Sequence, residues 1–385
     1  MGSIRPKSTW KVKKWWKQIK QRPGWVKLLN WEYWPSVAFY WPMTIAGPLM
    51  ALRAKHPCFF TAANPGLHAG GVGLESKFQT LDLLPESYQP QSILARPGES
   101  FDLIESRLLR AGITFPLIAK PDIGYRGFLV RKLDSPEELE NYLQSYHIDF
   151  IIQEYLDYPE EVGIFYYRLP GERRGKVVSL TLKKFLYISG DGHSTVRELI
   201  ERKPRALLQL EDLEKTRPDI LSQIPDYGEK VPLSVIGNHC KGTQFINGNQ
   251  FIDDQLCDTF DQISRNITGF HYGRFDVKCQ SLEALKAGRE FKIIELNGAF
   301  SEPTHIYDAQ RSTYWQALRT IVRHWRIVRQ IATANHAQGV PFMRASDMLS
   351  ELRALKDYHR KIKMALERDA VIKKRNLSLS ADARQ

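Results

Sequence analysis

The chain has 385 residues and a formal net charge of +12, and 43% of its residues are hydrophobic and 25% are charged. This length and composition predict a folded protein with two or three packed subdomains, and they exclude wholesale disorder. Its 4 cysteines are scattered and form no CxxC pair, which argues against zinc ribbons and disulfide scaffolds and favours reduced thiols in a cytoplasmic protein.

The positive charge is concentrated near the N-terminus. Residues 1–55 contain eleven Lys or Arg and one acid, Glu32, so they carry +10, and the remaining 330 residues carry only +2. The same segment holds seven of the nine tryptophans, and Lys interleaved with Trp suits an anionic membrane surface. Because the rest of the chain is almost neutral, we expect no nucleic-acid partner. The expected location is cytoplasmic, and a peripheral position on the inner face of a membrane through residues 1–55 stays open.

An uncharged stretch lies within this basic, Trp-rich extension, which we place at residues 1–57. Residues 33–52 carry no charge, and a helix of that length would reach about 30 Å, enough to cross a bilayer core. Pro35, Pro42 and Pro48 interrupt the stretch, so a shallow interfacial segment is favoured over a span. The alternative is that the stretch packs on the protein body and the basic arm is a solvated tail.

From Phe59 onward the composition is that of a compact enzyme. Loops rich in Gly and Pro lead to Glu75-Ser76-Lys77, where Lys77 is a candidate phosphate contact. A buried strand at 115–121 presents Lys120, and a loop with Gly124 and Gly127 follows, whose backbone N–H groups can approach phosphate closely. The other predicted elements here are an amphipathic helix at 100–113, a strand at 128–130, a helix at 135–146 and a strand at 150–156.

Two further strands, at 162–169 and 176–187, are joined by a short turn, and the second carries Lys183 and Lys184. Because successive side chains of a strand face opposite sides, one of these lysines would face phosphates and the other solvent. The remaining predicted elements are a helix at 195–202 capped by Ser194 or Thr195 with Glu198, a surface helical insertion at 203–230, a strand at 231–236, helices at 253–267, 307–335 and 343–375, and a frayed tail from Leu377.

Two short apolar β runs near residue 280 end in oxygen ligands. Asp276 lies in the run 275–277 and Glu295 follows the run 291–294, so both carboxylates can project from one sheet face. Such oxygens suit Mg²⁺, with Mn²⁺ as an alternative, and Arg274 adds a permanently charged donor for phosphoryl oxygens. The alternative is that these are solvated strand-end carboxylates with Arg274 as a surface partner. The sequence contains no GxxxxGK[ST] motif, no GxGxxG after a strand and no HExxH.

In order along the chain, these motifs resemble the ATP-grasp superfamily over residues 59–305. The set comprises Lys77, Lys120-Pro121 with its glycine loop, Gln153 to Leu156, Lys183/Lys184, Arg274-x-Asp276 and Glu295-x-Asn297. Residues 190–200 look like the matching segment of cyanophycin synthetases and bifunctional glutathione synthetases. The Ser76-Lys77 element and the block 274–297 are similar to D-alanine–D-alanine ligases.

The resemblance implies an α+β ATP-grasp fold whose two subdomains hold ATP, with a basic N-terminal extension and C-terminal helices. It implies an ADP-forming carboxylate–amine ligase of the acid–amino acid type, which uses ATP and Mg²⁺ on small-molecule substrates. It divides the chain into the extension at 1–57, a segment preceding the ATP-grasp part at 58–110, a lid subdomain at 111–190, a catalytic subdomain with the Mg²⁺ site at 191–308, and C-terminal helices and tail at 309–385.

The resemblance also implies a role for each motif residue. Phosphate contacts fall to Lys77, Lys120, Gly124, Gly127 and Lys184 or Lys183. The adenine pocket falls to Glu154, Tyr155 and Leu156, the ribose to Glu161, the metal to Asp276, Glu295 and Asn297, and the acyl-phosphate step to Arg274 with Lys184. The loop 122–127 has fewer Gly and Ser than the family pattern, and His239 and Lys241 stand in a segment that normally has small residues.

The chemistry needs no protein nucleophile. A carboxylate is a poor electrophile, so it first takes the γ-phosphoryl group of ATP, and an amine then attacks the acyl phosphate. A lid formed by residues 121–128 and 170–194 would exclude water from that intermediate. Two alternatives remain, an ATP-grasp phosphotransferase acting on a hydroxyl and a non-catalytic nucleotide-binding scaffold at a membrane.

Overall fold

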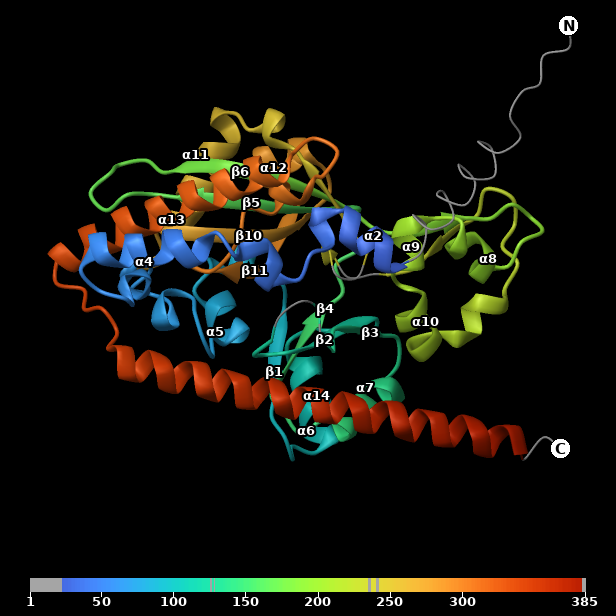
Figure 1. The fold of residues 1–385 in the computed structure, drawn as a ribbon. Helices are drawn as coiled ribbons and strands as arrows, with labels where there is room; N and C mark the ends of the chain where they lie inside the picture. The colour runs from blue at the N-terminus through green and yellow to red at the C-terminus, as the bar shows by residue number, and fades with distance from the viewer. Residues whose placement is uncertain (1–22, 125–126, 128, 235–236, 240–241, 383–385) are drawn as a thin grey trace, which may run out of the picture. The chain divides into compact units, whose positions relative to one another are not determined.

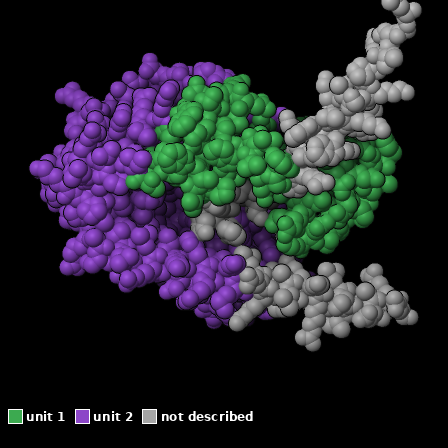
Figure 2. All heavy atoms as spheres, viewed as in Figure 1, with its two compact units in different colours: residues 1–44, 185–244, 306–318 green, residues 45–184, 245–305, 319–385 purple. Residues whose placement is uncertain are grey.

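The computed structural model describes residues 23–124, 127, 129–234, 237–239 and 242–382. The arm before residue 23, lid residues 125, 126 and 128, residues 235–236 of a predicted strand, and residues 240–241 lie outside this described part. The chain forms two compact units, each assembled from separate stretches of sequence (Figure 2). Unit 1 comprises residues 1–44, 185–244 and 306–318, and unit 2 comprises residues 45–184, 245–305 and 319–385.

Unit 2 contains a four-stranded antiparallel sheet, sheet A, in the order β1-β4-β2-β3 (Figure 1). Its strands are β1 (Ser92–Ala95), β2 (Leu117–Pro121), β3 (Arg131–Leu133) and β4 (Phe150–Glu154). Helices α6 (Phe101–Arg110) and α7 (Pro136–Ser145) begin at serine caps and bury their apolar faces with Leu117, Phe150 and Ile152. One face of sheet A is therefore apolar, and alternation leaves Lys120 and Gln153 on the other.

A five-stranded sheet, sheet B, has the order β11-β10-β5-β6-β9. Its strands are β5 (Glu160–Tyr167), β6 (Lys176–Lys184), β9 (Gln244–Asn247), β10 (Tyr272–Cys279) and β11 (Phe291–Asn297). Helices α5 (Lys77–Asp82), α11 (Asp254–Arg265) and α12 (Leu282–Lys286) supply apolar side chains that pack with Ile164, Phe275 and Ile293 on one face of this sheet. The predicted α+β class is confirmed.

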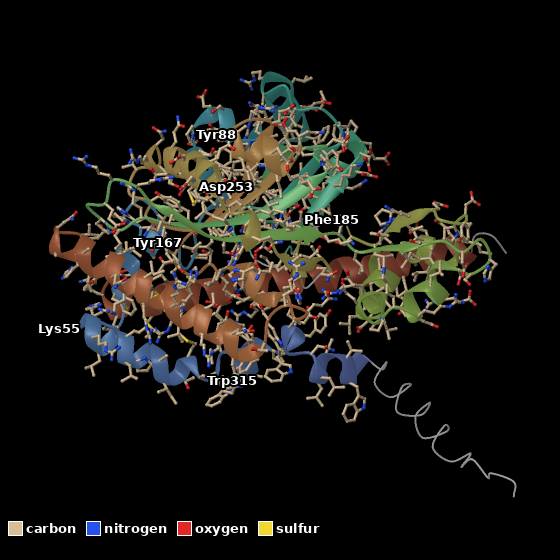
Figure 3. The ribbon with its side chains drawn as sticks, turned by 90° about the horizontal axis from the view of Figure 1, so that it is seen from above. Lys55, Tyr88, Tyr167, Phe185, Asp253 and Trp315 are labelled. Carbon is tan, nitrogen blue, oxygen red and sulfur yellow. The ribbon has the colours of Figure 1, made fainter. Side chains whose placement is uncertain are left out.

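The opposite face of sheet B is divided between an apolar end and a polar end. At the apolar end, Phe165 and Tyr272 pack with Ile331 of α13 (Tyr314–Ala337) and Met50 of α4 (Met43–Ala54). Figures 1 and 3 both show α4 lying along α13, with Lys55 just beyond the end of α4. The polar end carries the candidate site.

Helix α14 (Ala345–Asp382) is the last element of unit 2. Its Met348 packs with Cys58 and Val72, and its Ile362 packs in the core of sheet A. Figure 1 shows it as the long red helix beside α6 and α7. The short 3-10 turns of unit 2 are η2 (Phe59–Ala62), η3 (His68–Gly70), η4 (Glu86–Tyr88) and η7 (Asn249–Phe251), and η8 (Thr304–Tyr307) continues into unit 1.

Unit 1 has its own small core. Its elements are α2 (Pro23–Leu29), η1 (Trp31–Tyr33), α3 (Ser36–Tyr40), β7 (Tyr187–Ser189), α8 (Val196–Glu201), α9 (Pro204–Leu207), α10 (Leu210–Thr216), η5 (Pro218–Ser222) and β8 (Lys230–Pro232). Ile188, Val196 and Leu221 are buried together. In the N-terminal part, Trp31 and Phe39 stack with Tyr307, so the inner side of this stretch packs on unit 1.

Several predicted elements differ from the observed ones. The strand predicted at 176–187 ends at Lys184, because Leu186 and Ile188 turn into the core of unit 1 and pair with β8 instead. The strand predicted at 128–130 is absent from the described residues Leu129 and Val130. Leu129 has a left-handed φ of 56° and its carbonyl accepts a hydrogen bond from Tyr142, which keeps this residue out of the ladder.

Four further boundaries or assignments move. The strand predicted at 231–236 is observed at Lys230–Pro232, and the stretch predicted as a surface insertion encloses a core instead. The helix predicted from 307 begins at Tyr314, where Thr313 and Gln316 cap each other, and the last helix continues past Leu377 to Asp382. The capping box predicted at Thr195 and Glu198 is present. Within the described residues, no helix is both long and apolar enough to cross a membrane.

Candidate functional site

The polar end of sheet B gathers the predicted metal and acyl-phosphate residues. Asp276 on β10 pairs in register with Glu295 on β11, and Arg274 pairs with Asn297. Residues paired in an antiparallel ladder point to the same face, so all four side chains share one face. A bulge between Asp276 and Val277 in this register places Ile293 in the core while Glu295 stays outside it.

Lys183, and not Lys184, points to these carboxylates. Its side chain is 6% exposed, and its Nζ lies 2.8 Å from Glu161 Oε1 and 3.1 Å from Asp276 Oδ1. Burial alone would lower the pKa of Lys183, but Asp276 and Glu161 raise it to about 12. Lys184 is exposed at the end of β6. Strand alternation therefore places Lys183 on the face of the carboxylates and Lys184 on the other.

Asp276 is held by two cations and one amide. Arg274 donates from Nη2 to Asp276 Oδ2 (3.1 Å) and from Nη1 to the backbone carbonyl of Glu302 (3.1 Å), and Asn297 Nδ2 donates to Asp276 Oδ2 (3.3 Å). Burial opposes ionisation of Asp276, but the charges of Arg274 and Lys183 hold its pKa at about 2. The carboxylate is thus ionised at any physiological pH.

Lys120 is a buried cation with neutral partners. It is 9% exposed, and its Nζ donates to Gln153 Oε1 (3.2 Å) and to the backbone carbonyl of Ile294 on β11 (3.0 Å). The carboxylate of Glu295 instead pairs with Lys77, at 3.6 Å. Burial lowers the pKa of Lys120 to about 8, although Glu295 opposes the shift. An ammonium held this way keeps donor capacity for an anion that enters beside β11.

Glycine contacts bring the segment before α5 to the end of β11. Gly71, at a φ of 95°, lies so close to Gly298 that an added Cβ would meet the Cα of Gly298 at 2.4 Å. The N–H of Ala299 donates to the Gly70 carbonyl (2.9 Å). This close approach, which only glycine permits, delivers Glu75 and Lys77 to the site. Lys77 Nζ also donates to the carbonyl of Gly124.

Glu75 is a site residue that the sequence analysis did not single out. Its Oε1 is buried without a hydrogen-bond partner among the described residues. Burial and the negative charge of Glu295 raise the pKa of Glu75 to about 7, although Lys77 opposes the shift. The only sequence signal for Glu75 was its position two residues before the candidate Lys77. Its burial and its proximity to Glu295 depend on the fold and could not be predicted from local sequence.

Of the predicted adenine and ribose residues, Glu154 ends β4, Tyr155 and Leu156 lie in the loop that follows, and Glu161 lies on β5. Glu154 Oε1 accepts from the N–H of Gln91 (2.8 Å), and the Leu156 carbonyl accepts from Lys278 Nζ (3.0 Å). Tyr155 lies under the ammonium groups of Lys132 and Lys278. Glu161 is buried against Lys183. Gly127 has a left-handed φ of 68° in the loop after β2.

The donor set of this site fits Mg²⁺ or Mn²⁺ by its chemistry. Asp276, Glu295 and Asn297 share one sheet face and offer hard oxygen atoms. Within the described residues no group of three His, Cys, Asp or Glu side chains is placed to hold a metal ion. A magnesium ion that binds with nucleotide needs only one or two carboxylates, because phosphate and water complete its shell. The two paired carboxylates meet that requirement.

Neither a family model nor a curated protein matches this sequence. Among solved structures, the D-Ala:D-Ser ligase of Enterococcus faecalis aligns with 65% of this chain and 61% of its own, with a TM-score of 0.37 and 13% identity. A bifunctional glutathione synthetase from Pasteurella multocida aligns with 65% of this chain and 36% of its own, with a TM-score of 0.35 and 16% identity. The D-alanine–D-alanine ligase from Coxiella burnetii aligns with 76% and 64%, with a TM-score of 0.37 and 10% identity.

The aligned part covers less than two thirds of each of these three proteins. Because the TM-scores are below 0.5, these matches show only what the chain is similar to. A function for this chain has to be argued from the residues of its own site.

Proposed function

We propose that this chain is an ATP- and Mg²⁺-dependent ligase that joins a carboxylate to an amine through an acyl phosphate. The observation that carries this proposal is Lys120, a buried ammonium whose hydrogen-bond partners are neutral oxygens beside the carboxyl groups of Asp276 and Glu295. A lysine kept only for stability would be expected to meet a carboxylate, since burying an unpaired charge is costly. A bound phosphate group would accept a charge-assisted hydrogen bond from Lys120, which its two neutral partners do not provide.

The residues around Lys120 have different proposed roles in binding ATP and the metal ion. Lys77, Lys120 and Lys183 would neutralise phosphate oxygens, with Gly124 and Gly127 lining the phosphate loop. Asp276, Glu295 and Asn297 would hold Mg²⁺, which supplies further charge neutralisation when bound. Lys184 is exposed, so we transfer the role first given to it to Lys183. Glu154 to Leu156 and Glu161 stay the candidates for adenine and ribose.

The proposed reaction has two steps. A carboxylate oxygen of the first substrate bonds to the γ-phosphorus, and the bond to the β-phosphate oxygen breaks to release ADP. The amine nitrogen of the second substrate then attacks the acyl carbon, and phosphate leaves with the electron pair of the carbon–oxygen bond. Arg274 would stabilise the charge on the acyl phosphate. Glu75, ionised above about pH 7, would accept the proton that the amine loses.

The test is Mg²⁺-dependent ADP release by the full chain with pools of amino acids, dipeptides and small carboxylic acids. We expect one pool to stimulate release, and Glu295→Gln to lower that rate by about a hundredfold or more because it removes a charge that holds the metal. Glu283→Gln, on the exposed side of α12, is the matched control and should keep the rate.

Hydroxylamine separates this ligase from a phosphotransferase. The ligase forms an acyl phosphate that hydroxylamine converts to a hydroxamate, whereas phosphoryl transfer to a hydroxyl yields none. Release of ADP without hydroxamate would therefore overturn the proposal in favour of the phosphotransferase. ATP binding without turnover for any pool would favour the scaffold, and a normal rate in Glu295→Gln would remove the metal assignment.

We also propose that the enzyme rests on an anionic membrane surface. The outer face of α4 exposes Ile45, Leu49 and Leu52 by 62%, 52% and 75%, at the spacing of one helical face, and the exposed Arg53 and Lys55 follow. Figure 3 shows side chains on this outer side pointing away from α13. The inner face packs on α13, so these apolar residues are not needed for the core of unit 2.

The charge of this surface favours an anionic membrane as its partner. Glu32 is the only acid among residues 1–55, and its carboxylate is largely buried in unit 1, where it pairs with Arg205 at 2.7 Å and contacts His239 Nε2 at 2.8 Å. The described part of the segment, residues 23–55, therefore has exposed apolar and basic side chains and no exposed acid, which suits anionic lipid headgroups.

A further inference from the structure

The first turns of α14 hold the segment that leads to Glu75. Glu351 Oε1 lies 3.2 Å from His68 Nε2, and its Oε2 accepts the N–H of Leu74 (3.4 Å). The fit is close, because a Cβ added to Gly73 would come within 2.9 Å of Glu351 Oε2. The residue after Leu74 is Glu75, so Glu351 fixes the backbone directly before the proposed proton acceptor.

Two turns further along, α14 holds the loop after β2. The hydroxyl of Tyr358 lies near the backbone of Ile123 and the carboxylate of Asp122, and burial together with that carboxylate raises the pKa of Tyr358. The ring of Tyr358 packs against the core of sheet A. Glu351 and Tyr358 are seven residues apart and therefore lie on the same face of the helix, about 10 Å apart along its axis.

These two loops are also tied to each other. Asp122 Oδ1 accepts from Ser76 Oγ (3.0 Å) and from the N–H of Phe78 (2.8 Å), and the N–H of Lys77 donates to the Asp122 carbonyl (3.2 Å). Lys77 then reaches the Gly124 carbonyl with its ammonium group. The loops that present Glu75, Lys77 and Gly124 thus form one block, and α14 contacts both of its halves.

We propose that Glu351 and Tyr358 are positioning residues through which α14 sets the geometry of Glu75 and Lys77. The role of those two residues rests on the proposed ligase function. Among the side chains of α14 described up to Met364, Leu349, Leu352 and Met364 are exposed, and Met348 and Ile362 are buried. Glu351 contacts the segment before Glu75, and the Tyr358 hydroxyl lies at the loop after β2. This distribution is that of a brace for the site and not of a core helix.

Amide hydrogen exchange tests the brace without reference to catalysis. Glu351→Ala and Tyr358→Phe should each speed exchange in the peptides that cover residues 66–80 and 117–124, since each removes a contact that holds a loop closed. Asp357→Asn is the control, because Asp357 is exposed and pairs only with Arg360 of the same helix (3.1 Å) among the described residues. Unchanged exchange in both variants would overturn the proposal whether or not the chain is a ligase.

Steady-state ADP release supplies the second readout. We expect Glu351→Ala to raise the KM of the stimulating substrate by about tenfold with a much smaller change in kcat. Glu351→Gln keeps an acceptor for the Leu74 N–H and should recover most of that loss. Equal losses in the Ala and Gln variants, together with a lowered Tm, would mean a structural role only and would overturn positioning. If the wild-type chain does not turn over, the proposed function fails, and the exchange result alone decides the brace.

Discussion

At the scale of a single residue, Lys120 could be predicted from its local sequence, whereas its lowered pKa depends on burial in the fold. The sequence located Lys120, because a buried strand that ends in lysine before a glycine loop is a local pattern. Local patterns also predicted Asp276 and Glu295, from short β runs that end in oxygen ligands, with Arg274 beside them, and Lys77, from the Gly-rich loop region before it. The raised pKa of Glu75 could not be found, since it arises from burial and from Glu295, which is more than two hundred positions away in the chain.

The lowered pKa of Lys120 predicts a basic limb in the pH dependence. Below about pH 8 the ammonium of the free protein is charged and can pair with phosphate, and above that pH it loses its proton. The value of kcat/KM for ATP, which reports free-enzyme groups, should therefore fall as the pH rises through about 8. Bound phosphate raises the pKa of Lys120, so kcat should hold to a higher pH.

Lys120→Arg should remove this limb, because a guanidinium stays protonated. Lys132→Arg, at a half-exposed lysine on β3 that pairs with Asp134, is the control and should leave the limb in place. A basic limb that persists in Lys120→Arg would assign it to another group. The free energy of unfolding should change with pH in the opposite direction to kcat/KM. Between about pH 8 and 10.5 the unfolded chain binds more protons at Lys120 than the folded protein does, so the contribution of Lys120 to stability improves as the pH rises.

At the scale of elements, the bulge in β11 decides where Glu295 points. In an unbroken strand, Phe291, Ile293, Glu295 and Asn297 would all face the same side. The observed core contains Phe291, Ile293 and also Leu296, so the phase changes between 293 and 296 and moves Glu295 to the polar face. The sequence predicted the strand and the shared face with Asp276, but periodicity alone does not locate a bulge.

Adjacent lysines on β6 provide a test of the alternation. Lys183→Met should lower the free energy of unfolding by about 3–5 kcal/mol, because Glu161 would be left as an unpaired buried carboxylate. Lys184→Met, one position further on the exposed side, should change it by no more than about 0.5 kcal/mol. Urea denaturation curves of the two variants measure the difference. A larger loss of unfolding free energy in Lys184→Met than in Lys183→Met would mean that Lys184, and not Lys183, faces the carboxylates.

At the scale of the whole molecule, each unit combines stretches that are distant in the sequence. The segment 203–230 reads locally as a surface insertion, but its Leu213 and Leu221 bury with Ile188 and Val196. Local patterns gave the helices of this region. They could not indicate that residues from the N-terminus and from the start of α13 complete the same unit.

Membrane binding would involve the whole molecule, because the outer face of α4 and the basic N-terminal segment would attach it to a lipid surface. The full chain should sediment with vesicles that contain phosphatidylserine and not with neutral vesicles, and high salt should weaken the binding. Substituting Ile45, Leu49 and Leu52 together by Ser should abolish sedimentation, since it removes the apolar part of the surface. Leu109→Ser, at a similarly exposed leucine on α6, is the matched control.

Undiminished sedimentation of the triple variant would contradict the role of α4. If wild-type protein ignores vesicles but forms dimers that the triple variant lacks, the surface pairs with a second copy and the membrane proposal is wrong.

The way the chain leaves sheet B has a consequence for modularity. β6 ends at Lys184 and its neighbour β9 begins at Gln244, and the Gly248 N–H donates to the Leu180 carbonyl (2.9 Å), so β9 runs back along β6. The pair is a hairpin whose turn has been replaced by residues 185–243, which form about half of unit 1. Closing a loop costs only about 0.6 kcal/mol more for each doubling of its length, so strand pairing tolerates such an insert. Residues 185–243 could therefore be exchanged for another module, or for a short turn, while the strand that carries Lys183 keeps its neighbours.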